Sequence, residues 1–345
     1  MGATNETEER ERKPVVVLLE VLAAALVAAG CGEKKENVGP PGKQNLTVVL
    51  DYLPNPDHVG FYAAQQRGDF KRAGLNVDLK VPPDPSSPLK LLAAGKADLA
   101  ISYEPEVLLA RDRGLRVVSV GAIAQRPLTS IMALGSKGIR TPADLSGKTV
   151  GTAGIPYQSA YLKTIAQRAG VAPGSVKEVS VGFNLVPAML SGKADATLGA
   201  FWNIEGIQLA RSGKHPSIIR MDQAGVPTYN ELVLVARQSD VTPKANLIRR
   251  FLRALGQGYD FARHDPAAAT SELVDANPDL NEATSLAQVK ASLPVFFPPK
   301  GKPFGFADPA SWQRYGQWMF GNHLLKRPPN AGDALTNEFL PGQGL

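Results

Sequence analysis

The sequence predicts an α/β protein built from two similar lobes around a central cleft. From Leu46 onward, short apolar segments alternate with helical patterns of about ten residues, which is typical of βαβ units and a largely parallel sheet. The alternation starts again after residue 140, and the tetrapeptide Gly-Lys-Ala-Asp occurs twice, at 95–98 and at 192–195. A repeated series with a repeated corner indicates two α/β lobes of one design.

The first series of segments runs from residue 46 to residue 124. Apolar runs predict strands at 46–51, 75–81 and 97–102. Helical spacing predicts a helix at 58–70, which closes near Gly68, and another at 86–95, which ends at Gly95. Segments 105–114 and 116–124 continue the alternation, so this part of the chain is expected to form one α/β lobe.

The second series begins with a helix start at Thr141, the expected N-cap, followed by Pro142 at the first helical position. Apolar runs then predict strands at 176–182, 194–201 and 231–238, and helical patterns fall at 159–170 and 184–192. Beyond residue 240 the chain becomes mostly helical, with helices expected at 243–264, 266–278, 281–293 and 308–325.

The two Gly-Lys-Ala-Asp stretches are interpreted as equivalent helix-to-strand corners. Glycine ends the helix, lysine complements the negative helix end, and aspartate opens the turn into the strand. Ligands of open α/β sheets bind beyond the carboxyl ends of the strands. The residues that follow the two strands are therefore expected to face the cleft: Tyr103 and Glu104 in one lobe, and Phe201, Trp202, Asn203 and Glu205 in the other.

A further informative stretch is "DYLPNPDHVGFY" at 51–62. A strand ends at Asp51, two prolines stiffen the loop, and Asn55 can cap the next helix or donate into the cleft. Gly60 allows backbone or ligand to come close to the start of that helix. Taken singly, Asp51 and Asn55 are ordinary turn formers, and Tyr52 or Phe61 is ordinary core. Their position at strand ends together with other aromatic and acidic residues favours a binding site.

The expected pocket combines aromatic faces with acidic acceptors. Aromatic rings stack on flat ligands, and carboxylates accept hydrogen bonds from amino groups, so the pocket suits a flat nitrogen heterocycle. A small oxyanion such as a sulfonate fits poorly, because these loops lack Arg and Lys and Glu205 would lie beside it. The predicted ligand-binding residues are Asp51, Tyr52, Asn55, His58, Gly60, Ser102, Tyr103, Glu104, Tyr157, Asn184, Phe201, Trp202 and Glu205.

No pattern specifies catalysis, and no cofactor or metal is expected. Nucleotide-binding glycine loops and the G-x-S-x-G elbow are missing, and the four histidines form no H-E-x-x-H or close pair. The net charge of +6 is scattered without a long Lys/Arg run, which argues against nucleic-acid binding.

The stretches at 51–77, 95–106, 192–206 and 225–236 resemble the substrate-binding lipoproteins of ABC importers in the thiamine-pyrimidine synthase-like family. The resemblance covers about 46–325. It implies a type II periplasmic-binding fold, a membrane permease as partner, and a hydroxymethyl- or formylaminomethyl-aminopyrimidine as ligand. By the same resemblance, Asp51, Tyr52, Asn55 and His58 fall on the first motif, and Glu205 takes the place of a glutamate that accepts from the pyrimidine amino group.

The family pattern also implies one lobe made from both chain ends, 46–138 and 238–345, and an inserted lobe at 139–237. We expect Tyr52 and Trp202 to stack on the ring, and Glu205, with Asn55 or Asp51, to fix its polar edge. Riboflavin and a sulfonate-type compound remain alternative ligands. Pyrimidine synthesis from His58 or a bound cofactor is a remote alternative, because the synthase branch carries a cysteine-rich motif and this chain has one cysteine, Cys31.

The first 31 residues are expected to be a lipoprotein signal peptide. "RKPVVVLLEVLAAALVAAGC" places an apolar run before Ala-Ala-Gly-Cys31, which resembles a lipobox. The glutamate-rich start and Glu20 depart from that pattern, and a disordered tail is the alternative. Residues 32–45 are expected to be a polar tether. The expectation is a monomeric protein that is exported and held to the cell membrane by lipid on Cys31.

Overall fold

The computed structural model describes residues 43–343 and contains two five-stranded sheets. The first sheet has the order β2-β1-β3-β10-β4. In it, β1 pairs with β2 and β3 in parallel, whereas β10 runs antiparallel to β3 and β4. Its strands are β1 (Gln44–Val49), β2 (Leu75–Lys80), β3 (Leu99–Ser102), β4 (Val117–Ala122) and β10 (Val233–Arg237).

The second sheet repeats this arrangement with the order β7-β6-β8-β5-β9. Here β6 pairs with β7 and β8 in parallel, and β5 runs antiparallel to β8 and β9. In each sheet the antiparallel strand stands second from one edge, which confirms that the duplicated series makes two similar lobes. The strands are β5 (Thr129–Leu134), β6 (Thr149–Thr152), β7 (Lys177–Ser180), β8 (Ala196–Phe201) and β9 (Pro216–Arg220).

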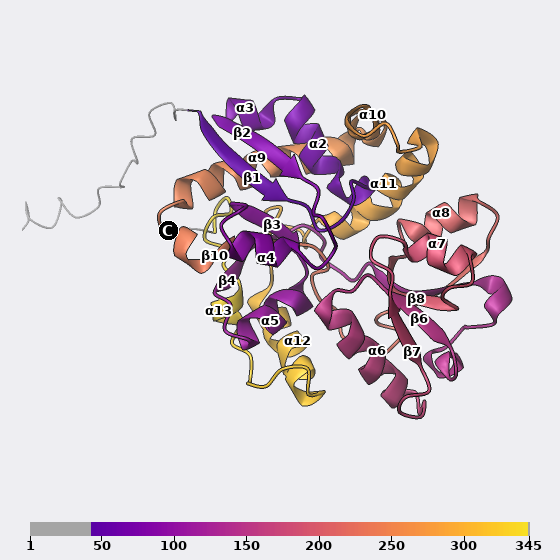
Figure 1. Cartoon of the computed structure of the whole chain (residues 1–345). Helices are drawn as coiled ribbons and strands as arrows, with labels where there is room; N and C mark the ends of the chain where they lie inside the picture. Colours follow the sequence, from indigo (N-terminus) through magenta and orange to yellow (C-terminus); the bar gives the residue numbers. More distant parts are fainter. Residues whose placement is uncertain (1–42, 344–345) are drawn as a thin grey trace, which may run out of the picture. The chain divides into compact units, whose positions relative to one another are not determined.

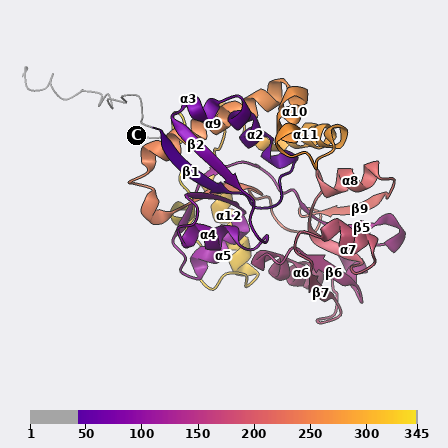
Figure 2. The same cartoon turned by 45° about the horizontal axis from the view of Figure 1, so that its top comes forward.

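Helices cover both sides of the first sheet, with α2, α3 and α9 on one side and α4 and α5 on the other (Figures 1 and 2). In the second lobe, α6 and α8 lie on opposite sides of the sheet (Figure 1). The helices of the first lobe are α2 (Val59–Gln66), α3 (Asp69–Arg72), α4 (Pro88–Ala93), α5 (Glu104–Asp112), α9 (Ala245–His264), α10 (Pro266–Ala276), α11 (Glu282–Phe296), α12 (Pro309–Gly321) and α13 (Ala331–Ala334). Those of the second lobe are α6 (Pro156–Arg168), α7 (Leu185–Leu190) and α8 (Glu205–Arg211), and the short 3-10 helices are η1 (Pro56–His58), η2 (Gly135–Lys137), η3 (Pro142–Leu145) and η4 (Gln238–Asp240).

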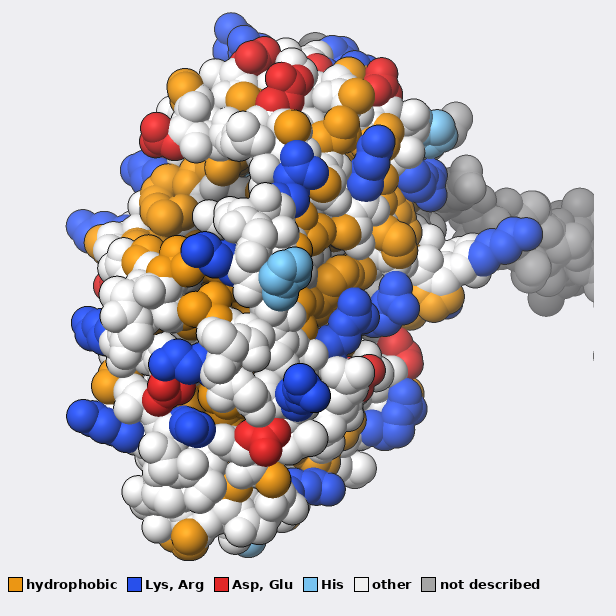
Figure 3. Space-filling model, turned by 90° about the vertical axis from the view of Figure 1, so that its right-hand side faces the viewer, with side chains coloured by type: hydrophobic (Ala, Val, Ile, Leu, Met, Phe, Trp, Pro, Cys, Tyr) orange, Lys and Arg blue, Asp and Glu red, His pale blue; other side chains and the backbone are white. Residues whose placement is uncertain are grey.

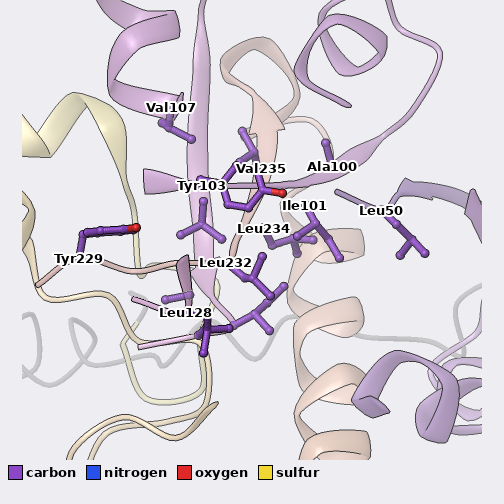
Figure 4. Packing of buried hydrophobic residues seen from close by; sticks show 14 of the residues in the cluster. Leu50, Ala100, Ile101, Tyr103, Val107, Leu128, Tyr229, Leu232, Leu234 and Val235 are labelled. Atoms are coloured by element: carbon purple, nitrogen blue, oxygen red, sulfur yellow. The ribbon is translucent and has the colours of Figure 1, made fainter. Parts of the chain in front are cut away.

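The core of the first lobe lies around the central strands β3 and β10. Figure 4 shows Ala100 and Ile101 of β3 packed near Leu234 and Val235 of β10. All four side chains are fully buried. Strands covered on both faces by helices need apolar residues at successive positions instead of an alternating pattern. This explains why 99–101 and 232–236 are continuous apolar runs.

The chain crosses between the lobes earlier than the sequence analysis expected. Because β5 belongs to the second sheet and β10 to the first, the crossings lie at 123–128 and 221–232. The expected lobe boundaries, at 138/139 and 237/238, were wrong because β5 pairs within the second sheet and β10 pairs within the first. The carboxylate of Glu231 holds the two crossing segments together. It accepts hydrogen bonds from Leu128 N (2.7 Å), Thr129 N (2.8 Å) and Tyr229 Oη (3.0 Å).

The two Gly-Lys-Ala-Asp corners are equivalent in the structure. Gly95 and Gly192 end their helices with φ of 71° and 74°. Asp98 accepts a hydrogen bond from Thr47 N of β1 (2.9 Å), and Asp195 accepts one from Thr149 N of β6 (3.0 Å). Each aspartate therefore fastens its strand to the neighbouring parallel strand. The lysines that pair with them come from elsewhere, Lys244 for Asp98 and Lys137 for Asp195.

The expected signal peptide at 1–31, with Cys31, lies outside the described residues, as does most of the tether at 32–45. Between residues 43 and 343, no helix is both long and apolar enough to cross a membrane. On the face drawn in Figure 3, lysine and arginine side chains are spread among neutral and hydrophobic ones.

Candidate functional site

A cavity of about 790 Å³ lies at the carboxyl ends of parallel strands from both sheets. Seven of the predicted site residues line it: Asp51, Tyr52, Asn55, Tyr103, Tyr157, Phe201 and Glu205. Residues of α7 supply part of its apolar wall. Leu53 of the first lobe and Leu190 of the second also line the cavity although 43% and 48% of each is exposed. The cavity is therefore bounded by both lobes, with aromatic, acidic and aliphatic side chains together.

The carboxylate of Asp51 is fixed from both sides. Its Oδ1 is 2.8 Å from Nε2 of the buried His58, and its Oδ2 accepts from Tyr103 Oη at 2.8 Å. His58 Nδ1 accepts from Asn55 N (3.2 Å), so Nε2 carries the proton that is donated to Asp51. Asn55 caps the short helix η1 by accepting from Asp57 N (2.8 Å). The Asp-x-x-x-Asn-x-x-His spacing thus builds a loop that holds one carboxylate rigidly at the cavity wall.

Tyr52 lies beside this carboxylate and contacts Phe183 of the second lobe edge to face, with ring centroids 4.8 Å apart. Its hydroxyl is buried and has no hydrogen-bond partner among residues 43–343. Burial raises the pKa of the Tyr52 hydroxyl, and the negative charges of Glu205 and Asp51 raise it further. The hydroxyl therefore stays protonated and is available as a donor.

Glu205 is the first residue of α8 and is half-buried. Its Oε2 accepts a hydrogen bond from Phe201 N at 2.7 Å, which fixes the side chain at the end of β8. Burial raises the pKa of Glu205 to about 7, and Asp51 adds to the shift, whereas the backbone hydrogen bonds oppose it. Near neutral pH the group exchanges a proton easily and can present an accepting oxygen to the cavity.

Trp202 does not line the cavity, so the prediction that it stacks on a ligand was wrong. Its Nε1 donates to Pro127 O (3.1 Å), and the guanidinium of Arg220 covers its ring at 4.1 Å from the centroid. Successive residues after β8 point in different directions. The side chain of Phe201 therefore lines the cavity, whereas that of Trp202 contacts the first crossing segment at Pro127. Phe201 from the same segment, and Phe183, supply the aromatic surface that Trp202 was expected to supply.

Ser102 and Glu104 lie behind the cavity wall and not in it. Ser102 Oγ donates to Glu106 Oε2 (2.5 Å), and Glu104 Oε2 accepts from Asn230 N (2.7 Å). Burial raises the pKa of Glu104 well above its ordinary range. Glu104 therefore connects α5 to the second crossing segment, which is a structural role.

Three further predicted residues are also absent from the cavity wall: His58, Gly60 and Asn184. His58 acts through Asp51. Gly60 faces helix α9, and a Cβ at Gly60 would lie 2.2 Å from the ring of Tyr259. The close approach expected at Gly60 is therefore made by a helix and not by a ligand. Asn184 is exposed at the start of α7 and makes no side-chain cap there.

Other lining residues were missed by the sequence analysis, chiefly Ile155, Gln158 and Phe183. Ile155 and Gln158 belong to the segment after β6, the strand of the second sheet that corresponds to β1. The sequence signal was present, because "AGIPYQ" follows β6 as "DYLPNPDH" follows β1. Aligning the two sheets strand by strand would have identified both loops as cavity walls.

Polar contacts join the lobes beside the cavity. Asn203, after β8, donates from Nδ2 to Asp57 Oδ1 and to Ser292 Oγ, both at 2.7 Å. Gln288 of α11 donates to Ile204 O at 2.9 Å. Asp57 Oδ2 and Asn203 Oδ1 are buried without partners among the described residues. Burial raises the pKa of Asp57 to about 8, although its hydrogen bonds to Ser292 and Asn203 oppose the shift.

The raised pKa of Asp57 predicts a loss of stability with rising pH. The unfolded chain ionises this group near pH 4, whereas the folded protein resists ionisation up to about pH 8, so the stabilisation is lost between these values. Asp57→Asn mimics the protonated form and is expected to flatten the dependence of the melting temperature on pH from 5 to 8. The raised pKa values of Glu205 and Glu106 also lower stability as pH rises, and they do so in the wild type and in Asp57→Asn alike. Equal slopes for the two proteins would contradict the prediction.

The comparisons with known proteins agree with this geometry. Residues 55–269 match the family model described as NMT1/THI5 like. The formylaminopyrimidine-binding protein of Halalkalibacterium halodurans is 34% identical over 93% of this chain and 98% of its own length. A 4-amino-5-hydroxymethyl-2-methylpyrimidine phosphate synthase of Saccharomyces cerevisiae, THI13, is 26% identical over 86% of this chain and 87% of its own.

Solved structures show the same fold. The alkanesulfonate-binding protein SsuA from Xanthomonas axonopodis pv. citri, bound to MOPS, superimposes with a TM-score of 0.69 at 16% identity. The match covers 86% of this chain and 99% of that one. The predicted type II periplasmic-binding fold is thereby confirmed.

Proposed function

Because the chain belongs to the NMT1/THI5-like family, we propose that it is the solute-binding component of an ABC importer and binds an aminopyrimidine precursor of thiamine. The observation that carries this proposal is the cavity between the lobes, in which the carboxylates of Asp51 and Glu205 lie among aromatic side chains. An aminopyrimidine is flat and carries an amino group, so aromatic contacts and an accepting carboxylate match both of its features.

The charges of the cavity favour an amino-bearing ligand over a sulfonate. Among the described lining residues, Arg211 is the one with a positive charge, and it is exposed and donates to Thr284 Oγ1 (3.2 Å). An anion deeper in the cavity would lie near Asp51 and Glu205, and desolvating it there would be costly. The cavity volume also admits an isoalloxazine ring, so riboflavin stays in the test as the second candidate.

We propose binding without chemistry, although some relatives are named synthases. His58, the histidine considered as a source of the pyrimidine, is fully buried behind Asp51 and does not line the cavity. Incubation with pyridoxal phosphate and iron, followed by mass spectrometry, tests this directly. A loss of mass at His58 would establish the synthase activity instead.

We also propose a location and a membrane partner for the protein. The protein would be exported, anchored by lipid on Cys31, and act as a monomer that delivers its ligand to a membrane permease. Support comes from the Ala-Ala-Gly-Cys sequence and from the fold. Loss of membrane association in a Cys31→Ser variant is the expected result, and unchanged association would remove the lipid anchor from the proposal.

Ligand binding is tested by calorimetry and thermal shift with hydroxymethyl- and formylaminomethyl-aminopyrimidines, thiamine, riboflavin and taurine. A ligand at a hundred times its dissociation constant adds about 2.7 kcal/mol to stability, which is a shift of several degrees. A shift with the aminopyrimidines supports the proposal. A shift with riboflavin or taurine alone would reassign the ligand and retain the fold.

Glu205 provides the pH prediction for binding. If its carboxylate accepts the amino group, affinity for the aminopyrimidine should fall as pH decreases through about 7, where Glu205 gains a proton. Glu205→Ala should lower the affinity roughly tenfold or more, because a charged acceptor is lost. Glu205→Gln is the control, since any pH dependence that it keeps belongs to the ligand. An unchanged affinity in Glu205→Ala would exclude this residue from the site.

A further inference from the structure

Gln158 is a buried amide whose orientation is fixed. Its side chain, 1% exposed, stands in the first turn of α6 and lines the cavity. Oε1 accepts a hydrogen bond from Ala153 N at 2.8 Å. Because a backbone N–H needs an acceptor, the amide oxygen must face Ala153, and the amide nitrogen must face the other way.

The amide nitrogen lies over Gly199 in the centre of β8. A Cβ at Gly199 would stand 2.4 Å from Gln158 Nε2, and Gly199 has a φ of 122°, which side-chain-bearing residues rarely adopt. Gly199 also lines the cavity. A side chain at position 199 would displace the amide of Gln158, and glycine at this position avoids that.

The amide nitrogen also has donor capacity to spare. An amide NH₂ group carries two N–H bonds, and the neighbouring Tyr157 hydroxyl can take at most one of them. Gln158 and Gly199 both line the cavity, so an acceptor on a bound ligand can take the second N–H. The other lining groups described above, Asp51 and Glu205, supply acceptors, so Gln158 complements them.

We propose that Gln158 determines specificity by donating from Nε2 to a ring nitrogen of the heterocycle. This inference rests on the proposed function and extends it, because it names the feature that the ligand must have besides its amino group. An aminopyrimidine presents an amino donor next to a ring-nitrogen acceptor. A carboxylate and a fixed amide can bind these two groups together, and an anilinic ring without nitrogen would satisfy only one of them.

The test compares the aminopyrimidine with its two aminopyridine analogues, in each of which one ring nitrogen is replaced by CH. Calorimetry with the wild-type protein should show roughly tenfold weaker binding for one analogue, the one that lacks the nitrogen facing Gln158. If both analogues bind as tightly as the aminopyrimidine, no donor reads a ring nitrogen and the inference is wrong. This arm needs no variant, so it does not depend on whether a substitution folds.

The second arm uses Gln158→Glu, which keeps an oxygen for Ala153 N and replaces the donor by an acceptor. The variant should bind the aminopyrimidine, and the analogue that keeps the nitrogen facing Gln158, at least tenfold more weakly than the wild type does. Its affinity for the analogue that lacks this nitrogen should stay close to that of the wild type. Equal losses for all three ligands would show a purely structural role. Gln167→Glu, the same change at an exposed position of α6, is the control. If the wild type binds no aminopyrimidine at all, the proposed function fails and not this inference alone.

Discussion

Gly258→Ala is expected to destabilise the protein by about 3 kcal/mol or more, the upper part of the range for overpacking a core. A Cβ at Gly258 would lie 2.0 Å from the carbonyl oxygen of Gly60 and 2.9 Å from Ala64 Cβ. Helix α9 contacts α2 through this point, and backbone atoms cannot rotate away as a side chain can. The helices must separate, so packing is lost along their whole contact.

Gly256→Ala is the matched control, because Gly256 lies in the same helix two residues away. Its added Cβ would meet Phe304 at 3.6 Å, an ordinary contact. Alanine favours helix over glycine by about 1 kcal/mol, so this variant should be neutral or slightly stabilised. Urea unfolding followed by circular dichroism measures both variants. Similar free energies of unfolding for the two would show that α2 and α9 do not approach so closely.

Glu231→Ala is expected to cost about 2–5 kcal/mol of unfolding free energy. Its carboxylate accepts from the backbone N–H groups of Leu128 and Thr129, and both would be left buried without that acceptor. The same carboxylate accepts from Thr129 Oγ1 through Oε1 at 2.8 Å. Removal of Glu231 therefore loosens both crossing segments together.

Glu231→Gln separates the hydrogen bonds from the charge. Its amide oxygen can accept from the two backbone N–H groups while its nitrogen donates to Thr129 Oγ1, so most of the stability should be kept. Burial raises the pKa of Glu231, which means that the neutral amide also avoids the cost of burying a charge. Thermal unfolding of the two variants gives the comparison. A glutamine variant as unstable as the alanine variant would contradict this account of Glu231.

The features of the fold that the sequence predicted correctly are those fixed by local pattern. Strand ends, the two glycine corners and the loop from Asp51 to His58 follow from residues close together in the chain. The direction of a side chain after a strand depends on what packs against it, as the contact of Arg220 with Trp202 shows. Gly60 was misassigned for the same reason, because its partner Tyr259 is distant in the sequence.

The crossings were misplaced because apolar runs do not reveal which sheet a strand joins. Segments 129–134 and 233–237 are both apolar, and only pairing assigns β5 to the second sheet and β10 to the first. The loop that carries Gln158 could be recognised by its position after β6, but the orientation of the Gln158 amide could not. That orientation depends on a hydrogen bond from Ala153 N and on the space left by Gly199.

Strand β10 belongs to the first sheet but follows the whole second sheet in the chain. This has a consequence for the order in which the two sheets can form during synthesis. All five strands of the second sheet are contiguous in the chain, from Thr129 to Arg220, whereas the first sheet lacks an inner strand until Val233–Arg237 has been made. Without β10, β3 and β4 have no common neighbour. The amino-terminal strands therefore cannot complete their sheet until the inserted lobe has left the ribosome, so the second lobe is the first that can finish folding.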